Sequence, residues 1–138
     1  MVAFNKFNSF VAAVANKVHN LGADSLRVML TNVAPIATNT VRANLTEIAA
    51  GNGYTSGGFA VTITGSTQTA GVYKLVGNDI VFTATGAVGP FQYAVLYNDT
   101  ATNKELIGWW IAGSPVTLAN TDPYTLDFDQ AGGILTIT

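Results

Sequence analysis

The chain of 138 residues has no cysteine, a single histidine and few charged residues. Without cysteine, disulfide bonds and thiol catalysis are excluded. A serine–histidine–aspartate triad would have to use His19, and no catalytic motif surrounds that residue. His19 falls late in an expected helix, where the helix dipole favours a cation, so a structural role is the simpler interpretation. We therefore expect no catalytic residue and no enzymatic activity.

Charge of either sign is scarce, since only 10% of the residues are charged and the formal net charge is −2. The basic residues form no cluster in the sequence, so we expect no nucleic-acid partner. No apolar run approaches the length of a membrane span, so we expect no membrane partner. Apolar residues make up 49% of the chain. This balance suggests that part of the surface is covered by a partner or by copies of the same chain.

The acidic residues Asp122, Asp127 and Asp129 lie close together near the end of the chain. Three carboxylates offer the oxygen ligands that calcium prefers, but the spacing of a calcium-binding loop is missing and Asp122 precedes a proline. The glycines likewise do not follow the spacing of a phosphate-binding loop. We interpret the carboxylates as solvated turn residues and expect neither a metal nor a cofactor.

The first part of the chain predicts an amphipathic α-helix from about residue 3 to about residue 20. Asparagine and lysine interrupt it at helical spacing, so we interpret it as part of the mature chain and not as a signal peptide. Gly22 is placed where a glycine commonly ends a helix. Apolar residues recur at steps of three and four along one side. This stripe consists of Phe4, Phe7, Val11, Val14, Val18 and Leu21.

From about residue 25 the apolar residues alternate instead, which predicts β-strands. Leu26, Val28 and Leu30 share one side of the first strand. A long segment with little strand character follows, in which Asn44 and Glu47 could cap a short helix that ends near Gly51. Residue 59 then begins a strand-rich region. Its expected strands are 59–64, 72–76, 79–85, 91–98, 105–112, 116–118, 123–128 and 134–138.

Many short strands divided by Gly, Pro, Asn and Asp predict a mainly β fold. We expect an antiparallel β-sandwich, jelly-roll-like, over residues 25–138, with the helix at about 3–20 packed against it. The length favours a single domain, residues 1–138.

Residues 91–112 are expected to form a β-hairpin with the sequence NDTATNK at its tip. Its second strand carries the only two tryptophans, Trp109 and Trp110, whose side chains must face opposite sides of the sheet. Trp109 shares its side with Ile107 and Ile111, so we assign Trp109 to the core. Trp110 is then expected to face outward or to lie beneath the helix.

Trp110 also heads a set of aromatic residues that are candidates for contact with another protein, because tryptophan is enriched at interfaces. Burial of both tryptophans in the chain's own interior is the alternative, and stacking of one ring on a sugar is a third possibility. The interface candidates are Trp110, Phe4, Phe7 and Tyr54.

Four segments spread over essentially the whole chain carry a family resemblance. They are FNSFVAAVANKVHNLGADSLRVMLTN, NLTEIAAGNGYTSGG, GPFQYAVLYNDTATNKELIGWW and GSPVTLANTDPYTLDFDQAGGILTIT. In their order and spacing they resemble a group of small structural proteins encoded by tailed bacteriophages. The resemblance implies a virion component, foremost a capsid decoration (cement) protein. Such a protein binds the outer surface of the shell formed by the major capsid protein and stabilises it.

The same resemblance sets expectations for assembly. A homo-oligomer is expected, with a trimer favoured because quasi-threefold positions are natural decoration sites, and with a dimer as the alternative. Two other roles stay open. One is a neck or tail component of the particle, and the other is a glycan- or receptor-binding β-sandwich of a phage fibre.

Overall fold

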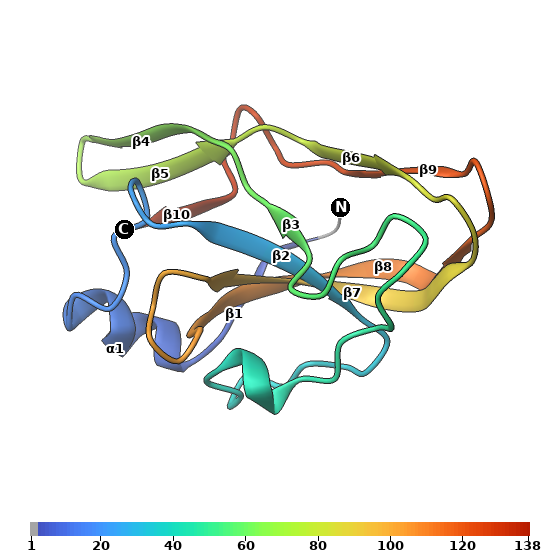
Figure 1. Cartoon of the computed structure of the whole chain (residues 1–138). Coiled ribbons are helices and arrows are strands. Elements are labelled where there is room, and N and C mark those ends of the chain that lie inside the picture. The colour runs from blue at the N-terminus through green and yellow to red at the C-terminus, as the bar shows by residue number, and fades with distance from the viewer. Residues whose placement is uncertain (1–2) are drawn as a thin grey trace.

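The computed structural model describes residues 3–138, and almost all of the regular structure in this range is β-strand (Figure 1). Every strand pair is antiparallel. One α-helix, α1 (Ser9–Ala15), and one 3-10 helix, η1 (Arg42–Asn44), complete the described part. The strands are β1 (Asn5–Lys6), β2 (Leu26–Thr31), β3 (Phe59–Ala60), β4 (Ile63–Thr69), β5 (Val72–Gly77), β6 (Ile80–Thr83), β7 (Val88–Asn98), β8 (Leu106–Leu118), β9 (Pro123–Leu126) and β10 (Leu135–Ile137). The prediction of a mainly antiparallel β fold with one N-terminal helix is confirmed.

Three sheets contain these strands. The largest has the order β1-β8-β7-β2-β3, and the two smaller sheets are β10-β5-β4 and β6-β9. Figure 1 shows both smaller sheets above one face of the large sheet, whereas the long segment between β2 and β3 runs below it. The large sheet therefore has covered surface on both sides.

Two hydrophobic clusters correspond to these two sides. The first, which we call the large core, takes side chains from the large sheet, such as Leu30 and Leu96, and from the smaller sheets, such as Leu75 and Leu126. The second, the small core, lies on the other side of the large sheet. It consists of Phe7, Met29, Val95, Tyr97, Leu106 and Trp109, with Leu45, Tyr93 and Ile111 packed against it. The predicted alternation along β2 is confirmed, since Leu30 belongs to the large core and Met29 to the small one.

The N-terminal helix is much shorter than predicted, because α1 covers only Ser9–Ala15. The residues before it form β1, which pairs with β8 and places Asn5 opposite Trp109. Phe4 and Phe7 therefore lie on opposite sides of the large sheet. The helical prediction for these two residues is wrong. Their spacing suits a helix, but pairing with β8 satisfies the backbone hydrogen bonds of a strand instead.

The helix predicted near Glu47 is absent, since only η1 forms in that region and Leu45 is already extended. The side chain of Asn44 accepts hydrogen bonds from the backbone N–H groups of Thr40 and Val41, at 3.0 and 3.1 Å. Asn44 therefore caps the turn that precedes it, and the segment continues to β3 without regular structure.

The predicted hairpin over residues 91–112 is confirmed, with β7 and β8 as its strands. The predicted strands 105–112 and 116–118 are parts of the single strand β8. Strand β4 extends beyond the predicted strand 59–64 to Thr69, because the reversal into β5 needs only Ala70 and Gly71, both with positive φ.

Candidate interaction surfaces

The two tryptophans face opposite sides of the large sheet, as predicted, and both are buried. Trp110 is 5% exposed and belongs to the large core, whereas Trp109 is 9% exposed and belongs to the small core. The assignment of Trp109 to the main core together with Ile107 is wrong. Leu96 pairs with Gly108 and Tyr97 pairs with Leu106, so Ile107 is an extra residue that interrupts the alternation. Because of this β-bulge, Ile107 lies on the side of Trp110.

The N-terminal segment covers both tryptophans. The Phe4 ring meets Trp110 edge-on at a centroid distance of 5.3 Å, and the Phe7 ring lies 4.5 Å from that of Trp109. Gly108 makes the first contact possible, since a Cβ on this residue would lie 2.1 Å from Cζ of Phe4. Phe4 thus completes the large core, and Phe7 completes the small core.

Most of the predicted interface residues lie in the interior of the chain. Trp110, Phe7 and Tyr54 are all buried, and Phe4 is half-buried against Trp110. The Tyr54 hydroxyl accepts a hydrogen bond from the Leu30 backbone at 3.0 Å. These side chains stabilise the fold, and a surface for another protein has to be sought among other residues.

A network of charged and polar side chains holds the segment between β2 and β3 against the sheet. The Glu47 carboxylate accepts hydrogen bonds from the Tyr54 hydroxyl and the Gly57 N–H, both at 2.7 Å, and pairs with Arg42 at 2.8 Å. The Tyr97 hydroxyl donates to the Gly57 carbonyl at 2.6 Å. Burial acts to raise the pKa of Glu47, but the bonds from Tyr54, Arg42 and Gly57 together lower it. The carboxylate therefore stays ionised at neutral pH.

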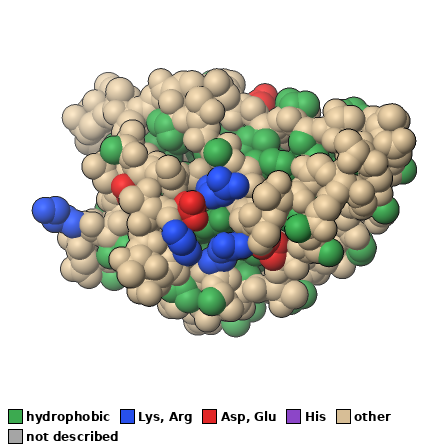
Figure 2. Space-filling model, viewed as in Figure 1, with side chains coloured by type: hydrophobic (Ala, Val, Ile, Leu, Met, Phe, Trp, Pro, Cys, Tyr) green, Lys and Arg blue, Asp and Glu red, His purple; other side chains and the backbone are tan. Residues whose placement is uncertain are grey.

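Figure 2 shows Lys, Arg, Asp and Glu side chains gathered near the middle of one face. Three cations, Arg27, Arg42 and Lys104, have an oxygen partner in the same chain. Arg27 donates to the Gly58 carbonyl at 2.5 Å, and Lys104 lies 3.4 Å from the Asp99 carboxylate. Because the cations are matched within the chain, we interpret this group as structural.

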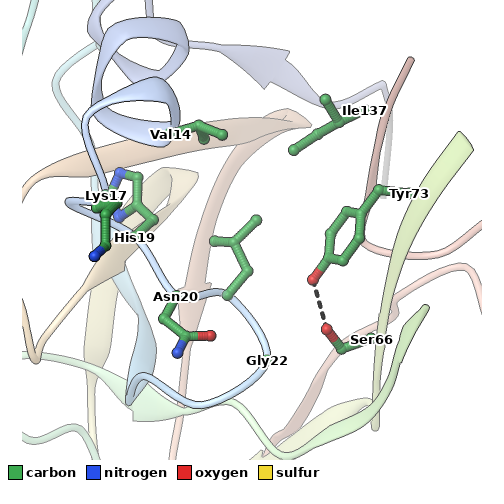
Figure 3. Close-up of a pocket in the computed structure, with 9 residues that line it drawn as sticks. Val14, Lys17, His19, Asn20, Gly22, Ser66, Tyr73 and Ile137 are labelled. Atoms are coloured by element: carbon green, nitrogen blue, oxygen red, sulfur yellow. Dashed lines mark hydrogen bonds between the residues drawn. The ribbon is translucent and has the colours of Figure 1, made fainter. Parts of the chain in front are cut away.

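A cavity of about 530 Å³ lies between the segment after α1 and the sheet of β4, β5 and β10 (Figure 3). The hydroxyls of Ser66 and Tyr73 are hydrogen-bonded at 2.8 Å on one wall, and His19 lies on the opposite one. Its other lining residues are Val14, Lys17, Asn20, Leu21, Gly22 and Ile137. The lining is largely apolar and its hydroxyls bond each other, so no ligand chemistry is evident.

His19 is a buried residue outside the helix, not the helix-terminal cation expected. Its Nδ1 lies 3.0 Å from Nδ2 of Asn98, which also donates to Asp24 at 2.6 Å. Nδ1 accepts this bond, so the ring proton of the neutral form is on Nε2. Nε2 has no hydrogen-bond partner within residues 3–138. Burial lowers the pKa of His19, while the carboxylates of Glu105 and Asp24 oppose that shift.

The acidic residues near the C-terminus include two turn carboxylates, as expected. Asp122 accepts a hydrogen bond from the Ala119 N–H at 2.9 Å, and Asp129 accepts from Ala131 and Gly132 at 2.9 and 2.8 Å. These two backbone donors, Gly132 first, lower the pKa of Asp129. Among the described residues there is no group of His, Asp and Glu side chains suited to a metal ion.

Three of the five large apolar side chains that are exposed in the described residues suggest a different surface from the one predicted. Val33 and Ile36 are 57% and 58% exposed, and Val11 of α1 is exposed to a similar degree. The Asn8 N–H donates to the Ala37 carbonyl at 2.9 Å, which holds residues 33–37 beside the start of α1. We call Val11, Val33, Ala34, Ile36 and Ala37, all exposed, the apolar ridge. Sequence analysis missed it because Val11 fitted the helical stripe and residues 33–37 followed no period.

None of the helices in residues 3–138 has both the length and the apolar character needed to cross a membrane. Comparison of the chain with protein-family models, curated proteins and solved structures finds no match. The sequence resemblance and the chemistry of the surface are therefore the two indications of function.

Proposed function

We propose that this chain is a non-enzymatic structural protein of a bacteriophage virion, a capsid decoration (cement) protein that binds the outer surface of the major capsid shell. The observation that carries the proposal is the apolar ridge, with Val33 and Ile36 more than half exposed. Exposed apolar groups on a chain with 10% charged residues favour burial against a partner. The sequence resemblance to tailed-phage structural proteins supplies the identity of that partner.

The physical basis of the proposed activity is non-covalent. Burying the ridge against the shell contributes about 25 cal/mol for each square ångström of apolar surface removed from water. One such contact is weak, but many copies on a closed lattice act together, and assembly multiplies the effect. Each copy linked to two neighbouring capsid subunits opposes their separation, which is how a decoration protein stabilises a shell.

The proposal includes a finer description of the fold. The large core takes side chains from the large sheet and from both smaller sheets. This shared interior supports a β-sandwich, for which we propose a jelly-roll-like arrangement.

Glycan binding by a phage fibre is the less favoured alternative. Sugar recognition uses the exposed face of an aromatic ring, and both Trp109 and Trp110 are buried. A neck or tail position uses the same kind of surface, and the location of the protein in the particle distinguishes it from decoration of the shell.

Co-sedimentation with capsid shells that lack the protein tests the proposal. The double variant Val33→Asp/Ile36→Asp is expected to bind shells at least tenfold more weakly, with an unchanged melting temperature, because both side chains are exposed. Val81→Asp is the matched control, since Val81 is 63% exposed and lies on β6. If the double variant bound shells as well as the control does, the apolar ridge would not be the surface that contacts the shell. Failure of the wild-type protein to bind shells would overturn decoration itself.

A further inference from the structure

Strand β4 is a long open edge of the described structure. It has seven residues and is the outer strand of the sheet β10-β5-β4. The large sheet ends in β1 and β3, which have two residues each, and β10 has three. Because β1 pairs only with Gly108 and Trp109, the rest of β8 also lies at an edge, but that part of the strand contains Pro115. The strands of the remaining sheet, β6 and β9, have four residues each, and β9 begins with Pro123. Short length and proline are devices that prevent pairing with other chains, and β4 has neither.

The composition of β4 also favours pairing. Its sequence, ITGSTQT, has no charged residue and no proline, and residues 66–69 are exposed. Charged side chains are the usual protection of an open edge. The irregularity in its pairing with β5 falls between Ile63 and Gly65, so the strand from Gly65 to Thr69 is regular.

The turn at the end of β4 fixes which backbone groups face the open edge. Thr69 pairs with Val72 across the two-residue turn, and the pair that flanks such a turn is hydrogen-bonded. In an antiparallel ladder the bonded residues of each strand alternate. Thr67 and Thr69 therefore direct their backbone groups to β5. Ser66 and Gln68 direct their N–H and C=O groups to the open edge.

We propose that β4 pairs with β4 of a second copy of this chain, antiparallel and across a twofold axis, with Thr67 opposite Thr67. This register sets Ser66 of each copy opposite Gln68 of the other, so that their outward N–H and C=O groups form four hydrogen bonds across the axis. The inference rests on the proposed function, for which the sequence analysis expects a homo-oligomer. It selects the dimer, not the trimer that was favoured from the resemblance.

A second copy fits this edge better than an unrelated strand for two reasons. Twofold pairing covers both open edges at once and is closed, so it yields a dimer and not a fibre. The strand also meets its copy without charge repulsion. Lys74, which lies opposite Thr67 on β5, would be separated from its counterpart by three strand spacings, about 14 Å, beyond effective range at physiological salt. Facing threonines are a favourable cross-strand pair.

Charge variants at the axis test the proposal on the full chain. We expect the wild-type protein to sediment as a dimer at micromolar concentration. Thr67→Glu and Thr67→Lys each place like charges face to face and should weaken the dimer at least tenfold. A 1:1 mixture of the two variants should restore it, because each mixed pair brings opposite charges together. Thr125→Glu and Thr125→Lys, on an exposed position of β9, are the matched controls and should sediment as wild type.

Each other outcome overturns the inference in a recognisable way. A wild-type dimer that is indifferent to both Thr67 variants, or a wild-type trimer, rejects the β4 edge while leaving self-association and shell binding intact. A wild-type monomer at high micromolar concentration rejects self-association as well. If that monomer binds shells and the Thr67 variants do not, the edge pairs with the capsid protein instead. Thermal unfolding of Thr67→Glu monitors folding, which the neighbouring Lys74 should support.

Discussion

Trp110 contacts aromatic rings from both ends of the chain. Its centroid lies 5.3 Å from that of Phe4 and 5.5 Å from that of Phe128. The large core around it also holds Leu30 and Leu75, from two different sheets. Trp109 has one close aromatic partner, Phe7, in a core of six buried residues. The two adjacent side chains therefore support different parts of the molecule.

Trp110→Ala should lower the free energy of unfolding by about 3–5 kcal/mol, the usual cost of removing a large buried aromatic side chain. Trp109→Ala should also be destabilising, but by no more than Trp110→Ala, because the small core has fewer members. Urea unfolding of the free protein measures both. If Trp109→Ala were destabilised and Trp110→Ala were not, the assignment of Trp110 to the large core would be contradicted.

His19 makes the stability of the fold depend on pH. Burial lowers its pKa from the ordinary value of 6.5, so the unfolded chain takes up the proton before the folded chain does. This contribution to stability is therefore complete above about pH 6.5 and decreases as the pH falls below that value.

His19→Gln should flatten this dependence. The slope due to one proton cannot exceed about 1.4 kcal/mol per pH unit. The free energy of unfolding of the wild type should fall between pH 7.5 and pH 5.5, and that of the variant should fall less. Urea titrations at the two pH values measure the difference. An equal fall in both proteins would assign the pH dependence to other groups.

The segment between β2 and β3 is held by a few backbone hydrogen bonds, such as that from the Ile48 N–H to the Leu30 carbonyl at 3.1 Å, and by side-chain hydrogen bonds. Glu47 is central, since it joins Arg42, Tyr54 and Gly57. Gly58, with φ of +79°, allows the chain to approach β2 so closely that a Cβ would lie 1.9 Å from the Val28 carbonyl oxygen. One carboxylate and one close contact thus add to these backbone bonds in a stretch with little regular structure.

Glu47→Gln should therefore loosen this segment locally. We expect a loss of about 1.5–3 kcal/mol, the range for hydrogen bonds to a charged group. The Gly57 amide should exchange with solvent faster, while amides of β7 should keep their protection. Hydrogen exchange read by NMR measures both, and Asp127→Asn, at an exposed carboxylate, is the control. Unchanged exchange at Gly57 would show that the carboxylate does not anchor the segment.

The sequence predicted strands well where apolar residues alternate, as in β2 and in the β7–β8 hairpin. It failed where a residue's role depends on a distant partner. Phe4 and Phe7 fit a helical stripe, and only the pairing of Asn5 with Trp109 makes the segment a strand. Ile107 fits the side of Trp109, and the bulge that moves it is set by pairing with β7. Non-local hydrogen bonds decided both cases.

The burial of the predicted interface residues within the chain was not foreseen for a related reason. Aromatic side chains are enriched at interfaces and also in cores, so their identity alone does not separate the two. The surface candidates that emerged are small or aliphatic, the ridge around Ile36 and the polar edge around Thr67. Neither has a sequence signature, because exposure and edge position arise only from the packing of all the strands.

The N-terminal segment links the two sides of the large sheet, since Phe4 joins the large core and Phe7 joins the small one. We expect both cores to unfold in one transition. Phe7→Ala should cost about 3–5 kcal/mol, and Phe4→Ala less, because Phe4 is only half-buried. Tryptophan fluorescence and far-ultraviolet circular dichroism should give coincident curves for wild type and variants. Separate transitions would show that the two cores are independent.

The sequence around the bulge at Ile107 also affects how the β7–β8 hairpin finds its correct pairing register during folding. In most strands, a shift of the pairing register by one residue moves apolar side chains to the solvent side of the sheet. The loss of apolar burial makes the shifted register unfavourable. In β8 such a slip would exchange one tryptophan for the other, so the strongest apolar signal would not distinguish the right alignment from the wrong one. Gly108 supplies the distinction, because only the correct alignment sets it beneath the Phe4 ring. A side chain at this position, as in Gly108→Ala, would collide with the Phe4 ring and with the Asn5 carbonyl and so oppose the correct alignment.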